Sequence, residues 1–339
     1  MSQKNDALVT IVIVNYNGAI FLGPCLDSIY AQPYRPIEVI VVDNASSDES
    51  VHIVRQKFPD VRLVTCDRNI GFAGGNNRGV MEATGEYVVL LNNDTMVERQ
   101  WLPALLTYAA NPEIAAVTSK VITEGVQSSL YEMNGTINYL GYNIMREFTD
   151  LSQVFFGSAA SLMFRKASVG IPFDDEFFLY HEDVYLSWKL RLSGFDVRMA
   201  QGSVVRHKGS ATTRRQPSPM VMFYQQRNRL LNMLFFYERK TLILLVPYLT
   251  IEAVGSIFAS ALIGRKSLRG ILRAYWWIVT NLRWVFDRRR DFQSSRTVPD
   301  VEIMKMMSCK VLNGDDPTSR VINRLSKLYA SIVGLPHHG

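Results

Sequence analysis

The chain has 339 residues, of which 47% are apolar and 20% are charged. This composition is that of a globular protein with a slight apolar surplus, which excludes a mainly disordered chain. The net charge of +6 favours anionic partners without saying which. The three cysteines lie far apart and form no CxxC pair, which argues against a zinc site or a disulfide framework and fits a reducing cytosol.

The first 120 residues alternate between short β-branched runs and longer helical stretches. We predict strands at 9–14, 37–42, 61–65 and 87–91, and helices at 21–31, 50–58 and 75–83. The run at 9–14 is too short for the apolar core of a signal peptide, so it is also assigned as a strand. Because the strands are apolar at successive positions, they are expected to be buried on both faces. The class is a doubly wound α/β fold with a mostly parallel sheet.

The pattern changes twice further along the chain. Between 120 and 215, glycines and polar residues separate short apolar runs, as expected for loops that build a binding site over a sheet edge. From about Met220 onward, long apolar and aromatic stretches alternate with arginines, and no strand pattern returns. We therefore predict one domain over 1–216 and a helical region over 217–339.

Three of the predicted strands end in polar residues. The first is followed by Asn15-Tyr16-Asn17, the second by 43–48 and the fourth by Asn92-Asn93-Asp94. Since carboxyl ends of parallel strands share one crevice, these side chains are expected to meet there. Asp43 can accept a hydrogen bond from a base or ribose, and Tyr16 can stack on a ring. The alternative for 43–48 is that it caps the following helix.

A glycine-rich stretch at 67–79 invites a dinucleotide-binding interpretation, but its spacing does not fit. That fingerprint requires G-x-G-x-x-G directly after the first strand, whereas these glycines follow the third. We expect instead a tight loop in which the backbone approaches a ligand closely, with Asp67, Arg68 and Asn77 as polar contacts.

Two acidic positions could carry chemistry. Asp94 follows an apolar strand, where a carboxylate can hold Mg²⁺ or Mn²⁺ against a diphosphate; the alternative is a helix cap ahead of Trp101. Glu182 and Asp183 open a predicted amphipathic helix whose dipole favours their ionised form, and an ionised carboxylate can act as a general base. They could instead only stabilise the helix.

His207 follows a short apolar run, where a lone histidine is more often structural than a ligand.

Taken together, these segments resemble the inverting family 2 glycosyltransferases of the GT-A fold. The likeness covers roughly residues 8 to 235. It rests on VTIVIVNYNG, VIVVDNASSDES, DRNIGFAGGNNRG, YVVLLNNDT, FFLYHEDVYLSWKLRLSGF and VVRHKGSAT, in that order. Within this family, the motifs resemble those of bacterial rhamnosyltransferases, which build surface polysaccharides on glycan or lipid-linked acceptors.

The resemblance implies a role for each candidate residue. Asp43 would bind the base of a dTDP- or UDP-sugar, with Tyr16, Asp67, Arg68, Asn77 and Asn93 nearby. Asp94 would be the acid of a D-x-D-like motif that binds a divalent metal (Mg²⁺ or Mn²⁺), with His207 as a further contact, and Asp183 would be the general base. The chain departs from the family at two points. Its metal motif has one acid, and Tyr185 stands where the family often has a second Asp.

The C-terminal third contains an apolar stretch at 242–264 that is about long enough to cross a bilayer, but Pro247 and Glu252 lie within it. Arginines interleaved with Tyr and Trp follow, as in helices that engage acidic lipid headgroups. We therefore predict peripheral attachment to the cytoplasmic face of the inner membrane. The alternatives are packing on the catalytic domain or on a second subunit, giving a homo-oligomer. No nucleic-acid-binding motif is found, so nucleic acid is not a predicted partner.

Overall fold

The computed structural model describes residues 7–123, 135–144, 150, 152–208, 218–314 and 316–336. Within these residues, eight strands form one sheet in the order β3-β2-β1-β4-β9-β6-β10-β5. The strands are β1 (Val9–Asn15), β2 (Ile37–Asp43), β3 (Arg62–Thr65), β4 (Tyr87–Asn92), β5 (Thr95–Val97), β6 (Ile114–Thr123), β9 (Ser161–Arg165) and β10 (Asp196–His207), while β7 (Thr136–Ile137) and β8 (Asn143–Ile144) pair separately.

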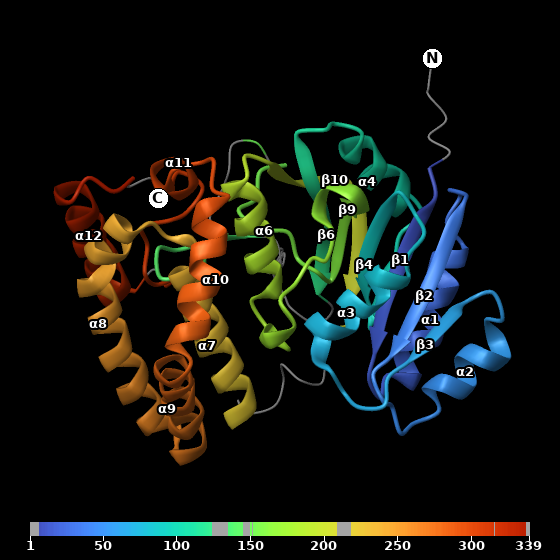
Figure 1. Cartoon of the computed structure of the whole chain (residues 1–339), viewed down its shortest axis with the longest axis horizontal. Coiled ribbons are helices and arrows are strands. Elements are labelled where there is room, and N and C mark those ends of the chain that lie inside the picture. Colours follow the sequence, from blue (N-terminus) through green and yellow to red (C-terminus); the bar gives the residue numbers. More distant parts are fainter. Residues whose placement is uncertain are drawn as a thin grey trace.

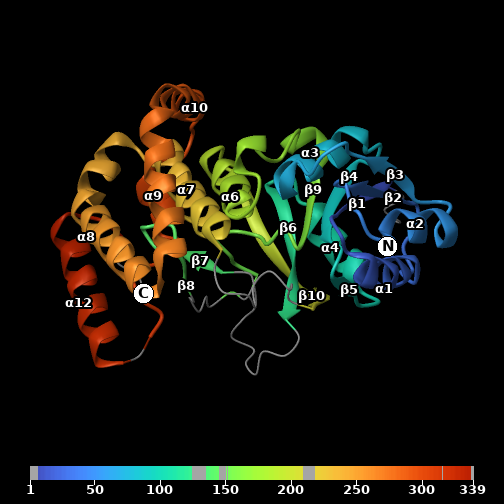
Figure 2. The same cartoon turned by 90° about the horizontal axis from the view of Figure 1, so that it is seen from below.

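The helices of the first two thirds cover both faces of this sheet (Figures 1 and 2). They are α1 (Ala19–Tyr30), α2 (Ser50–Lys57), α3 (Gly71–Glu82), α4 (Trp101–Ala109), α5 (Lys166–Val169), the short 3₁₀ helix η2 (Asp175–Phe177) and α6 (Glu182–Leu192). Alternate residues of β1 and β2 enter two separate apolar clusters, one with α1, α2 and α4 and one with α3 and α6. Burial on both faces explains why these strands are apolar at successive positions.

The four strands predicted from the sequence are all present, and β3-β2-β1-β4 pair in parallel as expected. The second half of the sheet is mixed, because β9 runs antiparallel to both β4 and β6, and β5 runs antiparallel to β10. The chain therefore has an α/β fold with a mixed, mostly parallel sheet and a helical C-terminal region.

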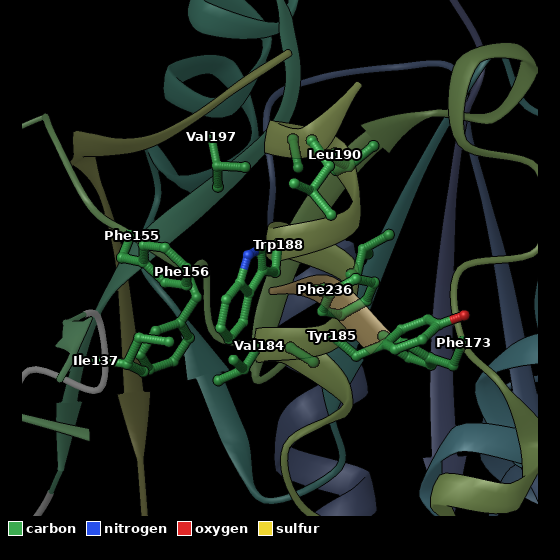
Figure 3. Close-up of a cluster of buried hydrophobic side chains, with 14 of the residues drawn as sticks. Ile137, Phe155, Phe156, Phe173, Val184, Tyr185, Trp188, Leu190, Val197 and Phe236 are labelled. Carbon is green, nitrogen blue, oxygen red and sulfur yellow. The ribbon is translucent and has the colours of Figure 1, made fainter. Parts of the chain in front are cut away.

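The C-terminal residues are helical and pack beside α6 (Figure 1). They form α7 (Pro219–Phe236), α8 (Arg239–Ile263), α9 (Arg265–Thr280), α10 (Leu282–Ser294), α11 (Asp300–Met304) and α12 (Pro317–Ile332). The predicted boundary at 216 and the GSAT end of the last motif lie outside the described residues. On either side of that gap, the two regions share one apolar cluster. Trp188 of α6 contacts Phe236 of α7, with ring centroids 5.5 Å apart, and Figure 3 shows both in this core.

Helix α8 is long and apolar enough to cross a membrane, by the length and composition of Arg239–Leu262. Its Glu252 does not face outward: Oε2 lies 3.0 Å from Nη2 of Arg229, and Oε1 accepts a hydrogen bond of 2.5 Å from the Tyr142 hydroxyl. The opposite side is exposed and apolar. It carries Ile243, Val246, Ile251, Val254, Phe258 and Leu262. The acid that appeared costly in a bilayer is thus paired inside the protein.

The basic and aromatic residues of α9 and α10 divide into two sets. Trp277 and Trp284 point inward, with centroids 5.5 Å apart, and Trp277 lies under the Arg227 guanidinium at 4.6 Å. Trp276 is 69% exposed on α9. It borders a shallow groove of about 370 Å³ whose other lining residues are Arg265, Leu268, Arg269, Leu272 and Arg273. Part of the aromatic pattern therefore serves the core, and the remainder forms a cationic and apolar surface.

Candidate active site

The carboxyl ends of β1, β2 and β4 are joined by side-chain hydrogen bonds. Asn15 and Asp43 are register partners at the ends of β1 and β2. The Asn93 amide donates to Oδ1 of Asn15 over 2.7 Å, and the Asn15 amide donates to Oγ of Ser46 over 3.1 Å. The predicted donor residues Asp43 and Asn93 therefore lie along one edge, linked through Asn15.

The alternative that 43–48 caps the following helix applies to Asp48 and not to Asp43. Asp48 accepts hydrogen bonds from the backbone N–H groups of Ala19 (2.9 Å) and Ser50 (3.1 Å), at the starts of α1 and α2. Asp43 is buried, and its Oδ2 accepts the Ser46 N–H over 3.1 Å within the turn. Asp48 satisfies helix ends, and Asp43 belongs to the sheet edge.

Three other predicted donor contacts lie on loops at this edge. Tyr16 directly follows β1 and is 52% exposed. Asp67 and Arg68 are exposed in the connection between β3 and α3. The N–H of Cys66 donates to the Asp43 carbonyl over 2.9 Å, so this connection starts beside Asp43.

The glycine-rich stretch corrects the expectation of a ligand loop. Helix α3 begins at Gly71, so Gly74, Gly75 and Gly79 are helical. A Cβ on Gly75 would lie 2.7 Å from Val14, and one on Gly79 would lie 2.2 Å from Val12. These two glycines therefore let α3 approach the sheet closely, and their surroundings are protein side chains instead of an open cleft.

Asn77 is used differently from the prediction. It is buried on α3, and its amide donates to the Phe173 carbonyl over 2.9 Å and to Oδ1 of Asp175 over 2.6 Å. Its Oδ1 accepts the Phe173 N–H over 3.1 Å. Both amide hydrogens thus hold the segment that leads into η2.

Asp94 and His207 meet at the far side of the same edge. Asp94 lies in the turn between β4 and β5, and Nε2 of His207, the last residue of β10, is 3.0 Å from its Oδ1. The Asn92 amide lies 3.4 Å from the same Nε2. Asp94 does not cap α4, whose N-cap residue is Gln100.

The donor atoms at this point fit a divalent cation. Neighbouring ligands of an octahedral Mg²⁺ or Mn²⁺ lie about 3 Å apart, given bonds of about 2.1 Å, which matches the His207 to Asp94 distance. Within the described residues, the buried Nδ1 of His207 and Oδ1 of Asn92 have no hydrogen-bond partner. In that part of the chain, no group of three or more His, Cys, Asp or Glu is arranged to hold a metal ion, so phosphate and water oxygens would complete the shell.

The acid pair opens α6, but the helix is not amphipathic as predicted. Its residues are buried on nearly every side, because α7 and α10 cover the face that would otherwise meet solvent. Burial raises the pKa of Asp183 to about 6, and burial together with the Asp183 charge raises the pKa of Glu182 to about 8. Desolvation therefore outweighs the helix dipole, opposite to our expectation.

Asp183 is tied to the loop beside β4. Its carboxylate receives hydrogen bonds from the backbone N–H groups of Val184 and Ala159. The next residue, Ala160, accepts the Asn92 N–H through its carbonyl over 3.1 Å. The predicted base and the end of β4, two residues before Asp94, thus contact neighbouring residues of one short loop. The raised pKa keeps Asp183 able to exchange a proton near neutral pH.

Three residues of the site were noted in the sequence but assigned no role of their own. Asn15 joins β1 to both neighbours, Asn92 lies against His207, and the second carboxyl, Glu182, is buried with its Oε2 unpartnered among the described residues. Each directly adjoins a residue that was assigned a role. For Asn15 and Asn92, the available signal was a polar residue at the end of an apolar strand.

Residues 10–170 match the model of the family described as Glycosyl transferase family 2. Among curated proteins, the chain is 31% identical over 102 residues to glycosyltransferase GlyA of Streptococcus pneumoniae serotype 4, covering 30% of this chain and 15% of that protein. It is 24% identical over 198 residues to the poly-beta-1,6-N-acetyl-D-glucosamine synthase of Staphylococcus aureus, covering 56% and 47%. The chain thus spans less than half the length of either relative.

Solved structures show the same fold. GalNAc-T7 with UDP, GalNAc and Mn²⁺ aligns with a TM-score of 0.59 at 12% identity, covering 82% of this chain and 58% of that one. The mannosyltransferase PcManGT from Pyrobaculum calidifontis, in complex with GDP-Man and Mn²⁺, aligns with a TM-score of 0.50 at 18% identity, covering 96% and 85%. The fold is therefore GT-A-like.

Proposed function

We propose that this chain is an inverting glycosyltransferase that moves a sugar from a nucleoside diphosphate donor to an acceptor hydroxyl. The observation that carries the proposal is the pairing of His207 with Asp94 at 3.0 Å on the edge that holds Asp43. Asp183 is attached to the adjoining loop through Ala159. A single displacement needs a leaving-group site and a base on opposite sides of the transferred sugar.

The donor side is assigned to residues of the sheet edge. Asp43 accepts from the base or ribose, Tyr16 flanks the ring, and Asn93, Asp67 and Arg68 contribute polar contacts. Asn77 leaves the donor set, because its amide holds 173–175. Asp94 and His207 would hold Mg²⁺ or Mn²⁺, which neutralises charge on the departing diphosphate when bound.

The acceptor side is assigned to Asp183. Its carboxylate takes the proton from the acceptor hydroxyl, the oxygen forms a bond to the anomeric carbon, and the bond from that carbon to the diphosphate breaks with inversion. Burial raises the pKa of Asp183 to about 6, so its carboxylate is a stronger base than that of an exposed aspartate and is still ionised near neutral pH. Glu182 stays protonated near neutral pH and leaves Asp183 as the charged member of the pair.

The finer assignment is a rhamnosyl donor carried on dTDP or UDP, with a glycan or lipid-linked acceptor of bacterial surface polysaccharide synthesis. The motif likeness supports the rhamnosyl donor, and the polysaccharide synthase among the relatives supports a role in polysaccharide synthesis. The alternative is a membrane-attached protein that binds nucleotide sugar, or scaffolds an assembly, without turnover. A panel of nucleotide sugars, assayed for nucleoside diphosphate release with and without lipid-linked acceptor, separates the two. Release from one donor supports transfer, and binding without release supports the alternative.

Attachment to the cytoplasmic face of the inner membrane is proposed from the exposed surfaces of α8 and α9. Glu252 lies nine residues after Ile243 along α8, which is half a turn away from the exposed stripe that begins there. The stripe can therefore enter lipid while Glu252 stays paired with Arg229. On α9, Arg265, Arg269 and Arg273 beside Trp276 match the anionic headgroup region.

A further inference from the structure

The segment at 177–181, directly before the acid pair, has an unusual backbone. Phe178, Tyr180 and His181 have φ angles of 57°, 69° and 63°, in the left-handed region that non-glycine residues rarely adopt. A run of such residues persists only where the surroundings hold it, and it is common beside catalytic groups. The segment ends at His181, the N-cap of α6, so its path sets the direction in which Glu182 and Asp183 leave the turn.

Helix α7 of the C-terminal region holds this segment. Asn228 is fully buried, and its amide nitrogen lies 2.8 Å from the Phe177 carbonyl, 2.9 Å from that of Leu179 and 2.8 Å from that of Tyr180. One turn later, the Asn232 amide donates to the His181 carbonyl over 3.1 Å. Two side chains of one helix therefore contact four carbonyls of five consecutive residues.

The opposite side of the segment is held by helix α3. The N–H groups of Phe72 and Ala73, at the start of α3, donate to the Phe178 carbonyl over 2.6 and 3.2 Å. The Phe178 ring stacks on Tyr224 of α7, with centroids 5.0 Å apart. The segment is thus fixed between α3 and α7, and α7 supplies side-chain donors that a free loop would obtain from water.

We propose that Asn228 is a positioning residue for the transfer reaction, with Asn232 as its helper. Asn228 holds the left-handed segment and thereby places the Asp183 carboxylate against the acceptor hydroxyl. Neither asparagine contacts the reacting groups. The helical C-terminal region then completes the catalytic site in addition to any part it plays at a membrane. This inference rests on the proposed function, because it takes Asp183 as the base.

The test compares Asn228→Asp with the parent and with Gln225→Ala, an exposed neighbour on α7. Asp keeps the shape of Asn but replaces the amide donor by a carboxylate that faces three carbonyls. With the donor found in the panel, we expect kcat to fall about 10- to 100-fold in Asn228→Asp. The donor KM should stay within about twofold, and the acid limb of the kcat profile should move. Gln225→Ala should match the parent.

A folded Asn228→Asp protein with parental kcat overturns the inference, and so does a fall in kcat with an unmoved acid limb, since that indicates a general structural loss. If Asn228→Asp does not fold, Asn232→Ala decides, because it removes a single hydrogen bond. A severalfold fall in kcat with a displaced acid limb supports the inference, and parental values overturn it. Asp183→Asn in the same assay keeps the proposals apart. If the parent turns over no donor, the proposed function fails; if Asp183→Asn alone is inactive, only this inference fails.

Discussion

Nε2 of His207 lies 3.0 Å from Oδ1 of Asp94, which joins the last residue of β10 to the turn after β4. If this pair holds a divalent cation, removing the metal with EDTA should abolish turnover, and Mn²⁺ or Mg²⁺ should restore it. Asp94→Asn and His207→Asn should each raise the metal concentration for half-maximal activity by at least about 10-fold.

The control for this metal titration is His52→Asn, which removes an exposed imidazole on α2 and should leave the metal requirement unchanged. Turnover by metal-free parent enzyme would contradict the assignment. A metal requirement in His207→Asn equal to that of the parent would exclude His207 as a ligand.

Glu182 predicts a pH dependence of stability. Its pKa is raised from 4.5 to about 8 in the folded protein, so the fold retains a proton that the unfolded chain releases. The stability gained from this proton is complete below pH 4.5, declines as pH rises and is lost above about pH 8. The unfolding free energy of Glu182→Gln relative to the parent should therefore grow between these pH values and then level off.

Urea unfolding of the parent, Glu182→Gln and Glu49→Gln measures this difference. Glu49 is exposed, so its variant should follow the parent across the whole range. If the Glu182→Gln and parent curves run parallel from pH 5 to pH 9, the pKa of Glu182 is not raised.

Close packing of α3 on the sheet predicts a stability loss at Gly79. A methyl group at this position would lie 2.2 Å from Cγ1 of Val12, so Gly79→Ala should destabilise the protein by about 1–3 kcal/mol. Gly23→Ala on α1 is the matched control. Apart from its chain neighbours and its own helix backbone, no described heavy atom lies within 4 Å of its Cβ position, so this change should stabilise by about 0.5–1 kcal/mol. Equal stability of Gly79→Ala and the parent in urea would contradict the packing.

The proposed membrane surface predicts lipid-dependent binding. Basic residues near an anionic surface contribute about 1 kcal/mol each, so replacing three arginines of α9 by Gln should weaken binding to anionic vesicles roughly 100-fold. The variant combines Arg265→Gln, Arg269→Gln and Arg273→Gln. Vesicle flotation measures the binding. Undiminished flotation of this variant would contradict a headgroup role for α9.

A matched triple variant on the α/β part of the chain controls for net charge. It combines the exposed positions Arg55→Gln, Lys57→Gln and Arg99→Gln. This protein should float with anionic vesicles as the parent does. Flotation lost equally in both triples would indicate a general charge effect.

The sequence predicted the parallel half of the sheet well, because β1, β2 and β4 are apolar at successive positions and end in polar residues. It did not predict β9 or the length of β10, since their pairing depends on partners far along the chain. The amphipathic expectation for α6 was wrong because α7 and α10 cover its outer face. The hydrogen bonds of Asn77 and Asn228 could not be predicted, since their partners lie about 50 or more residues away.

The decline of kcat at low pH should also follow from the burial of Asp183. Because burial raises the pKa of Asp183 to about 6, and the base acts in its ionised form, kcat should decline as pH falls through about 6. Measurement of kcat between pH 5 and pH 9 with saturating donor tests this. An acid limb near the usual aspartate range, around pH 4, would show that the buried environment is lost in the working enzyme.

The most direct measurement is the turnover of Asp183→Asn with the preferred donor and acceptor, beside calorimetric binding of the donor. A positioned general base contributes about 10²–10⁴-fold, so kcat should fall by that factor while the donor Kd stays unchanged. Near-parental transfer by this variant, with donor binding intact, would contradict the assignment of Asp183 and with it the proposed reaction.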